Sequence, residues 1–306
     1  MAKILITGGT GQVLTSATQA LAREHDVWCI GRFESDAARQ ALETGGIRTA
    51  KWTMGVDSLV AVPDDFTYVV HGARRAARDS DFEPAIADQC VGVAMLMQHC
   101  RQAEAFLYLS SSAVYTRAVA DHPQTESDPT GGNSPHMPSY AISKIAAEGT
   151  VRGLCATLNI PSLMARVNVA YGPHGWGGLP MRYLGAMLQG EPVPLPLDGD
   201  NYLNPIHTDD IAEQLPGLLD AAAVPATVVN WAGDETITEA QLARYMAAIT
   251  DVPLKFERRA VTASPSAADN SRRMRLVGPC RVGWREGIRS SIKAHFPDLA
   301  VSELDP

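Results

Sequence analysis

Short apolar runs alternate with longer segments of helical periodicity through the first half of the chain. The runs predict six strands: Lys3–Thr7, Asp26–Ile30, Ile47–Trp52, Phe66–His71, Ala105–Ser110 and Pro161–Val169. The segments between them predict four helices: Gln12–Arg23, Ser35–Thr44, Glu83–Arg101 and Ser139–Leu158. This alternation indicates an α/β fold, in which a doubly wound parallel sheet carries helices on both faces.

The pattern changes at Gly172, and glycine and proline are frequent from there to Pro205. The elements expected beyond this point are three helices, Leu179–Gln189, Thr208–Ala223 and Thr238–Thr250, and one strand, Thr227–Asn230. We therefore expect a Rossmann-type dinucleotide-binding domain and a smaller C-terminal substrate-binding lobe. The domain comprises residues 1–171 plus 206–232, and the lobe comprises residues 172–205 plus 233–306.

Composition and charge exclude several classes of protein. The 306 residues are 45% apolar and 20% charged, which is ordinary for a globular protein with a sizeable core. A net charge of -8 offers no electrostatic footprint for nucleic acid or for an anionic membrane. No apolar run approaches the roughly 18 residues of a membrane span, and the N-terminus lacks a signal-peptide pattern.

The spacing of the cysteines and histidines indicates neither a disulfide framework nor a metal site. The five cysteines form no CxxC pair, and the eight histidines show no HxxxH or HExxH spacing. Such a chain is expected to hold reduced thiols and no metal, and to reside in the cytoplasm.

A glycine-rich turn, Thr7-Gly8-Gly9-Thr10-Gly11, follows the first predicted strand and precedes a helix. Glycines let the backbone approach a pyrophosphate, and the helix N-terminus beyond them supplies free N–H groups. The residues expected to contact the cofactor here are Thr7, Gly8, Gly9, Thr10, Gly11 and Gln12. The third glycine of the usual GxxGxxG pattern is replaced by Leu14, which predicts altered packing of the helix on the sheet.

The end of the second predicted strand bears on the choice of cofactor. Enzymes that use NAD carry an acidic residue there, which accepts hydrogen bonds from the ribose hydroxyls. This chain has Arg32 instead, whose planar guanidinium can pair with a 2′-phosphate. NADP is therefore the first choice of cofactor and NAD the second, unless Arg32 is an ordinary surface residue.

Tyr140 and Lys144 lie four residues apart on a predicted helix and therefore share one face. A neighbouring ammonium favours the phenolate, so such a tyrosine can exchange a proton with a carbinol or carbonyl oxygen. Ser110, Ser111 and Ser112 follow the fifth predicted strand, where sheets of this kind place their chemistry. One of these serines can donate a hydrogen bond to the reacting oxygen, while at least one of the three is expected to cap a helix or bond a turn.

Seven segments in the same order resemble the NAD-dependent epimerase/dehydratase family, the extended branch of the short-chain dehydrogenases. They are TGGTG at Thr7–Gly11, VVHGAR at Val69–Arg74 against the family's VxHxAA, SSSAVY at Ser110–Tyr115, PSYAISKIAAE at Pro138–Glu148, ARVNVAYGPHG at Ala165–Gly175, NPIHTDDIA at Asn204–Ala212 and VVNWAGDETIT at Val228–Thr238. The resemblance covers nearly the whole chain and implies an NAD(P)-dependent enzyme that transfers hydride.

The resemblance also assigns roles to individual residues. It implies that Tyr140 is the acid/base and Lys144 its partner, with Ser111 as the catalytic hydroxyl and Ser112 as its alternative. The residues implied to line the far side of the cofactor are His71, Gly72 and Ala73. The residues expected to face the substrate are Ser112, Asn168, His174 and Trp176.

The family's phosphate anchors are only partly present in this chain. The asparagine that often touches a nucleotide diphosphate is replaced in register by Val169, with Asn168 one residue early. The arginine that often precedes the FVHVDD segment is also missing, because Tyr202-Leu203-Asn204 stands there. Both departures favour a smaller or less charged substrate than a nucleotide sugar.

Three functions remain open at this point. The first is an epimerase or dehydratase that acts on a sugar-like or other small polar substrate and retains its cofactor through the turnover. The second is an NADPH-dependent carbonyl reductase or dehydrogenase whose cofactor exchanges. The third is a catalytically silent nucleotide-binding regulatory protein. By resemblance, a homodimer is expected through the helices near Glu83–Arg101 and Ser139–Leu158.

Overall fold

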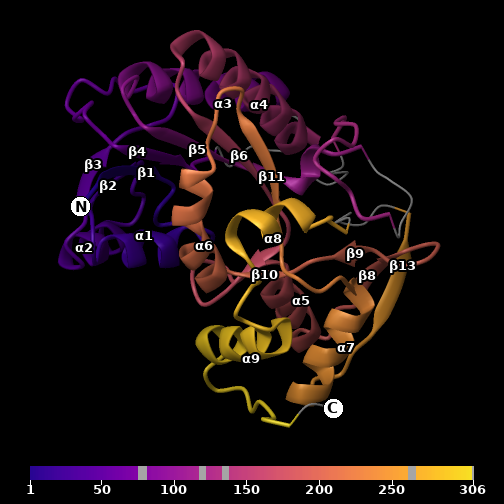
Figure 1. Cartoon of the computed structure of the whole chain (residues 1–306). Coiled ribbons are helices and arrows are strands. Elements are labelled where there is room, and N and C mark those ends of the chain that lie inside the picture. The colour runs from indigo at the N-terminus through magenta and orange to yellow at the C-terminus, as the bar shows by residue number, and fades with distance from the viewer. Residues whose placement is uncertain (75–80, 117–121, 133–137, 261–266, 305–306) are drawn as a thin grey trace.

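A seven-stranded parallel sheet forms the centre of the protein (Figure 1). The structure is a computed structural model that describes residues 1–74, 81–116, 122–132, 138–260 and 267–304. The strands of the sheet are β1 (Lys3–Thr7), β2 (Asp26–Gly31), β3 (Arg48–Lys51), β4 (Tyr68–His71), β5 (Ala105–Ser111), β6 (Ser162–Val167) and β11 (Thr227–Trp231). They lie in the order β11-β6-β5-β4-β1-β2-β3, and each neighbouring pair is parallel. The expected doubly wound Rossmann fold is confirmed.

Helices cover both faces of the sheet. They are α1 (Thr15–Leu21), α2 (Asp36–Thr44), α3 (Phe82–His99), α4 (Pro138–Leu158) and α6 (Thr208–Asp220), and a 3₁₀ turn, η1 (Ser112–Val114), follows β5. Side chains alternate along β1, so that Ile4 packs toward α1 and α6 while Leu5 packs toward α3 and α4. Figure 1 shows α3 and α4 together on one side of the sheet and α1 and α6 on the other.

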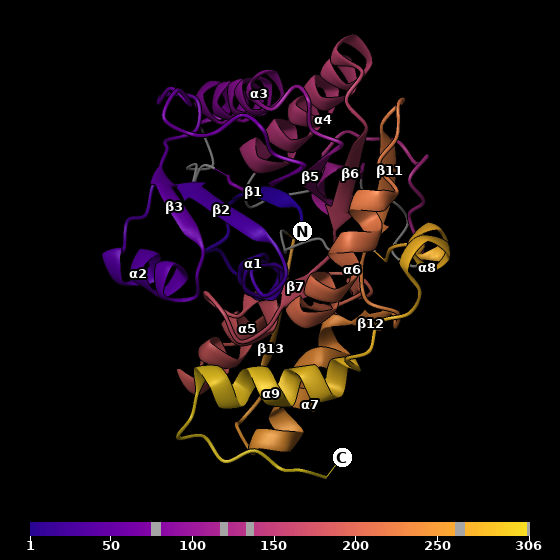
Figure 2. The same ribbon diagram turned by 60° about the vertical axis from the view of Figure 1, so that its left-hand side comes forward.

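A third core lies outside the sheet and draws on the C-terminal half of the chain. Its elements are α5 (Gly178–Leu188), α7 (Glu239–Thr250) and α9 (Trp284–His295), which surround buried side chains such as Leu184, Met246 and Ile288. Figure 2 shows these helices gathered below the sheet.

Short strands and one more helix complete the C-terminal half. The strand pairs are β7 (Ala170–Tyr171) with β10 (Ile206–His207), β9 (Tyr202–Leu203) with β12 (Ile237–Thr238), and β8 (Val193–Pro196) with β13 (Phe256–Arg259). Helix α8 (Ser271–Val277) packs on α6 and β11, so the C-terminal segment contacts both the sheet and the third core. The division into a domain and a lobe stays a prediction.

The first helix differs from its expected bounds. We predicted Gln12–Arg23, but α1 covers only Thr15–Leu21, because the residues after Gly11 form a turn. Thr15 joins that turn to the helix: both its N–H and its hydroxyl bond to the Gly11 carbonyl, at 3.2 and 2.7 Å.

The order of strands reverses between β1 and β4, since the chain leaves β1 toward β2 and later returns to β4 on the other side. Loops diverge at such a switch point and leave a crevice at the carboxyl ends of the strands. The glycine turn after β1 and the segment His71–Ala73 after β4 meet at this crevice.

Candidate active site

A pocket of about 940 Å³ opens at the carboxyl ends of the central strands. It brings together most of the residues predicted from the sequence: Gly8, Gly9, Thr10, Gly11, Gln12, Arg32, Gly72, Ala73, Ser111, Tyr140, Lys144 and Trp176. Five predicted residues are not part of its lining: Thr7, His71, Ser112, Asn168 and His174. Residues as distant in the sequence as Gly8 and Trp176 thus share one cavity.

The glycine turn presents bare backbone to this pocket. Gly8 has a φ of 77°, and a Cβ atom there would lie 2.8 Å from the carbonyl carbon of Gly72. A Cβ atom on Gly9 would lie 2.8 Å from Cys29 Sγ, so neither position admits a side chain. A surface of main-chain N–H groups at the start of a helix fits a pyrophosphate, and these residues therefore suit a dinucleotide.

Thr7 and His71 lie beneath the glycine turn, where they join β1 to β4. The Thr7 hydroxyl is 2.6 Å from His71 Nδ1 and accepts a hydrogen bond from the Ala73 amide at 3.0 Å. His71 is fully buried, and burial followed by repulsion from Lys144 lowers its pKa to about 3. This neutral histidine therefore holds the segment after β4 in place beneath the pocket.

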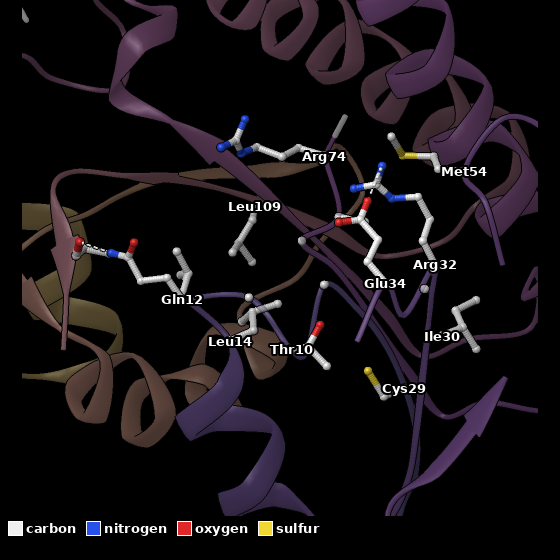
Figure 3. A pocket seen from close by; sticks show the side chains of 18 of the residues that line it. Thr10, Gln12, Leu14, Cys29, Ile30, Arg32, Glu34, Met54, Arg74 and Leu109 are labelled. Carbon is white, nitrogen blue, oxygen red and sulfur yellow. Dashed lines mark hydrogen bonds and ion pairs between the residues drawn. The ribbon is translucent and has the colours of Figure 1, made fainter. Parts of the chain in front are cut away.

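Arg32 and Glu34 stand together at one end of the pocket, just after β2 (Figure 3). A nitrogen of Arg32 is 3.1 Å from Glu34 Oε1, and both side chains are about half exposed or more. Sequence reasoning identified the arginine but not the glutamate. The pair could have been found from their spacing, because two residues separated by one position at the end of a strand can face the same side.

Tyr140 and Lys144, on the first turns of α4, both line the pocket. Lys144 Nζ donates a 2.7 Å hydrogen bond to the Leu109 carbonyl and lies 5.9 Å from the centre of the Tyr140 ring. Lys144 is buried, and this burial, reinforced by the positive charge of Arg74 and opposed by Glu148, lowers its pKa to about 7. The ammonium is therefore held under the tyrosine by the end of β5.

The three serines after β5 have different partners. Ser110 donates to Glu148 Oε1 at 2.6 Å, and the Ser112 hydroxyl accepts from Asn168 Nδ2 at 3.2 Å. Ser111 caps η1 by accepting from the Ala113 amide, and within the described residues its hydroxyl proton has no acceptor. Of the three, Ser111 alone both lines the pocket and keeps a proton to donate.

Asn168 forms hydrogen bonds within the protein and does not line the pocket. Its side-chain oxygen accepts from the Asn204 amide at 3.0 Å while its nitrogen donates to Ser112, so it ties β6 to the segment before β10. Val169 lines the pocket in its place and has a φ of 32°, a backbone conformation that is rare for a β-branched residue.

A buried ion pair supports the catalytic helix. Glu148, one turn after Lys144, accepts two hydrogen bonds from Arg166 of β6, at 2.9 and 2.8 Å. The Arg166 guanidinium also lies 4.7 Å from the centre of the Tyr115 ring. Because an unpaired buried charge is costly, this pair fixes the position of α4 relative to β5 and β6.

Arg74 is a second charged residue of the pocket, after Glu34, that sequence reasoning overlooked. It directly follows Ala73, and its guanidinium lies 5.6 Å from the centre of the Tyr140 ring. The signal was present, because the segment VVHGAR has arginine where the family pattern VxHxAA has its second alanine.

Two further classes of site are absent from the described parts of the chain. No group of three or more histidine, cysteine or carboxylate side chains is arranged to hold a metal ion there. No described helix has the length and apolar character required to cross a membrane. The five cysteines are free in this structure.

Solved structures with the same fold cover almost the whole chain. UDP-glucuronic acid 4-epimerase from Bacillus cereus is 20% identical, with a TM-score of 0.82, over 95% of this chain and 98% of that one. UDP-N-acetylglucosamine 4-epimerase from Methanobrevibacter ruminantium is 19% identical, with a TM-score of 0.83, over 97% of this chain and 99% of that one. At such identities the likeness establishes the fold.

Comparison of the sequence with known proteins identifies its family. A trifunctional UDP-glucose 4,6-dehydratase/UDP-4-keto-6-deoxy-D-glucose 3,5-epimerase/UDP-4-keto-L-rhamnose-reductase from Arabidopsis thaliana is 24% identical over 69% of this chain. The match covers about a third of that protein's length, 34%. The model of the NAD dependent epimerase/dehydratase family matches residues 4–230, which hold the glycine turn, Ser111, Tyr140 and Lys144. The chain therefore belongs to the NAD-dependent epimerase/dehydratase family.

Proposed function

We propose that Tyr140 is the acid/base of a hydride-transfer reaction at a carbinol or carbonyl carbon of a sugar-like or other small polar substrate. The nicotinamide supplies the hydride acceptor and donor when it is bound. The observation that carries the proposal is that Tyr140, Lys144 and Ser111 line the same pocket as the glycine turn. A phenol there can pass a proton to or from the substrate oxygen.

Each of the three side chains has a distinct task. Ser111 donates its free hydroxyl proton to the substrate oxygen and so orients the reacting group. Lys144, held by the Leu109 carbonyl, lies 5.9 Å from the centre of the Tyr140 ring and is placed to bond the ribose hydroxyls of the cofactor. In this arrangement Ser111 orients the substrate oxygen and Tyr140 exchanges its proton.

The test is the Tyr140→Phe variant, which keeps the ring and removes only the hydroxyl. We expect turnover to fall by about 10²–10⁴-fold, the usual contribution of a positioned acid/base, while the nucleotide still binds. Unchanged turnover would remove Tyr140 from the chemistry. A wild-type protein that binds nucleotide but turns over no carbinol or carbonyl compound would favour the regulatory alternative.

A reductase or dehydrogenase with an exchanging NADP cofactor is the second candidate. The observation that favours it is Arg32, which stands in the pocket after β2 where a 2′-phosphate would be read. The decisive measurement is mass spectrometry of nucleotide released by denaturing the purified protein. Near-stoichiometric NAD or NADP supports the epimerase or dehydratase, whereas an empty protein that prefers NADPH to NADH supports the reductase.

The substrate would enter from the C-terminal side, and we assign residues 172–205 and 233–306 to the substrate-binding lobe. The pocket wall on that side is apolar and includes Val169, Leu179 and the half-exposed Trp176. The named relatives act on UDP-sugars, but this wall lacks the two phosphate anchors of the family pattern. A smaller sugar-like substrate, with a ring that could stack on Trp176, fits it better.

Assembly and location complete the proposal. We propose a cytoplasmic homodimer in which α3 and α4, already packed on each other, form a four-helix bundle with a second copy. The exposed apolar side chains Phe82 and Val91 of α3 support this interface. Light scattering that gives the mass of a monomer, 32.8 kDa, would contradict it.

A further inference from the structure

Arg74 places a positive charge at the reacting end of the pocket. It follows β4 and Ala73, its side chain is exposed, and it lines the same cavity as Ser111 and Tyr140. Its guanidinium lies 5.6 Å from the centre of the Tyr140 ring. In Figure 3 this guanidinium points away from the Arg32–Glu34 pair, on the side of the cavity where Leu109 and Gln12 lie.

This guanidinium has no anionic partner within the described residues. Among the described residues that line the pocket, Arg32 is the other arginine and is paired with Glu34, whereas Arg74 makes neither a hydrogen bond nor an ion pair with a described residue. Asp88 of α3 also lines the pocket, but it has an interaction of its own and is not bonded to Arg74. An exposed arginine in a concave site, whose N–H donors bond to no described residue, is suited to bind an anion.

The surroundings of Arg74 strengthen the preference for negative charge. Lys144 lies 5.9 Å from the same tyrosine ring, so cationic side chains approach Tyr140 from two directions. The positions where the family pattern holds a diphosphate are Val169, which lines the pocket, and Tyr202-Leu203-Asn204, which do not line it, and none of them carries a charge. Attraction for an anion is therefore concentrated beside the acid/base instead of at a distance from it.

We propose that Arg74 determines specificity by binding a carboxylate that lies one or two carbons from the reacting carbon of the substrate. The substrate class is a hydroxy or keto acid with further hydroxyl groups, that is, a sugar acid. This inference rests on the proposed function, because it takes Tyr140 as the reacting end of the pocket. The planar fork of arginine matches a carboxylate in two parallel hydrogen bonds, which also fixes the orientation of the carbon chain.

The test compares two probes that differ in one group, D-gluconate and its uncharged counterpart D-glucitol. Isothermal titration calorimetry of the nucleotide-saturated full-length protein measures both affinities. We expect gluconate to bind at least about tenfold more tightly than glucitol, the size of effect that a charge-assisted bond produces. In the Arg74→Ala variant this preference should disappear, and Arg74→Lys should retain part of it.

A matched control is Arg101→Ala, which removes an exposed arginine outside the pocket lining and should keep the full preference. Equal binding of the two probes by the wild type, or an unchanged preference in Arg74→Ala, overturns the proposal. So does a loss of nucleotide affinity in Arg74→Ala with the gluconate preference intact, because Arg74 would then belong to the cofactor's phosphates.

Failure of the proposed function gives a different result. The Tyr140→Phe variant should retain the preference for gluconate, since binding of the carboxylate needs only Arg74. A Tyr140→Phe protein with normal turnover and a normal gluconate preference would reject the acid/base assignment while leaving the anion site in place.

Discussion

The side chain of Leu14 fills the space that Gly72 leaves open. A Cβ atom on Gly72 would lie 2.5 Å from Leu14 Cδ1, which is closer than two carbon atoms that are not bonded to each other can approach. Leu14 is fully buried at the start of α1, where the family's glycine turn has its third glycine. A large residue in one loop is thus matched by a missing side chain in the other, which allows the turn after β1 and the segment after β4 to pack together.

This pair predicts strong coupling between two positions. Gly72→Ala should lower the free energy of unfolding by about 1–3 kcal/mol, as expected for an overpacked core. Leu14→Ala makes room for the added methyl group, so Gly72→Ala should cost less in that background. Denaturant unfolding of both single variants and the double variant measures the coupling.

Gly149→Ala is the control for this cycle. Gly149 lies within α4, and a Cβ atom added to it would meet no other atom within 4 Å, so alanine there should be neutral or slightly stabilising. Purely additive effects at Leu14 and Gly72 would contradict the matched pair.

The backbone at Val169 predicts a stabilising substitution. Its φ of 32° is unfavourable for valine, and asparagine tolerates such conformations better. Val169→Asn should therefore raise the free energy of unfolding by up to about 1 kcal/mol. The same change at Val167, which has the extended backbone of β6, should be destabilising. A thermal melt of the two variants checks the contrast, and equal losses in both would argue against strain at Val169.

Glu239 predicts a pH dependence of stability. This buried carboxyl accepts hydrogen bonds from the Tyr183 hydroxyl and from Asn201 Nδ2, both at 2.7 Å. Burial outweighs these bonds and raises its pKa from 4.5 to about 7. The folded protein therefore binds a proton that the unfolded chain releases, and stability should fall as the pH rises from 4.5 to about 7.

The Glu239→Gln variant should lose that part of the pH dependence, because the amide does not titrate. Chemical denaturation at several pH values between 4.5 and about 7, compared with the wild type, measures the difference. As a control, Glu303→Gln changes a fully exposed carboxyl and should leave the profile close to that of the wild type. Parallel profiles for wild type and Glu239→Gln would reject the assignment.

Arg32 and Glu34 predict how the choice of cofactor can be altered. Glu34 pairs with the guanidinium that we assign to a 2′-phosphate, so the carboxylate and the phosphate compete for it. Arg32→Ala should weaken NADPH binding by about tenfold or more with little effect on NADH, since a charge-assisted contact is lost. Glu34→Gln should change the ratio in the opposite direction. Fluorescence titration with both nucleotides measures it, and a ratio that neither variant changes would exclude Arg32 as the selector.

Much of the fold could be predicted from local sequence alone. Apolar runs such as Lys3–Thr7 and Ala105–Ser110 became central strands within one residue of their expected bounds, because strands buried on both faces require continuous apolar residues. The cap of α7 was also predictable, since the Thr238 side chain bonds to the Gln241 amide three residues later. The glycine turn and the Tyr140–Lys144 pair were recognisable because their chemistry depends on short spacings.

Only the tertiary structure decided which of these residues act together. Ser110, Ser111 and Ser112 are equivalent in sequence, and Glu148 and Asn168 distinguish them by occupying the hydroxyls of the first and third. The packing of Leu14 into the space at Gly72 likewise joins segments that are distant in the chain, and so does the approach of Arg74 to Tyr140. Local sequence determines the preferences of each segment, whereas contacts across the switch point of the sheet depend on how the strands are ordered, and that order is set by packing of the whole chain.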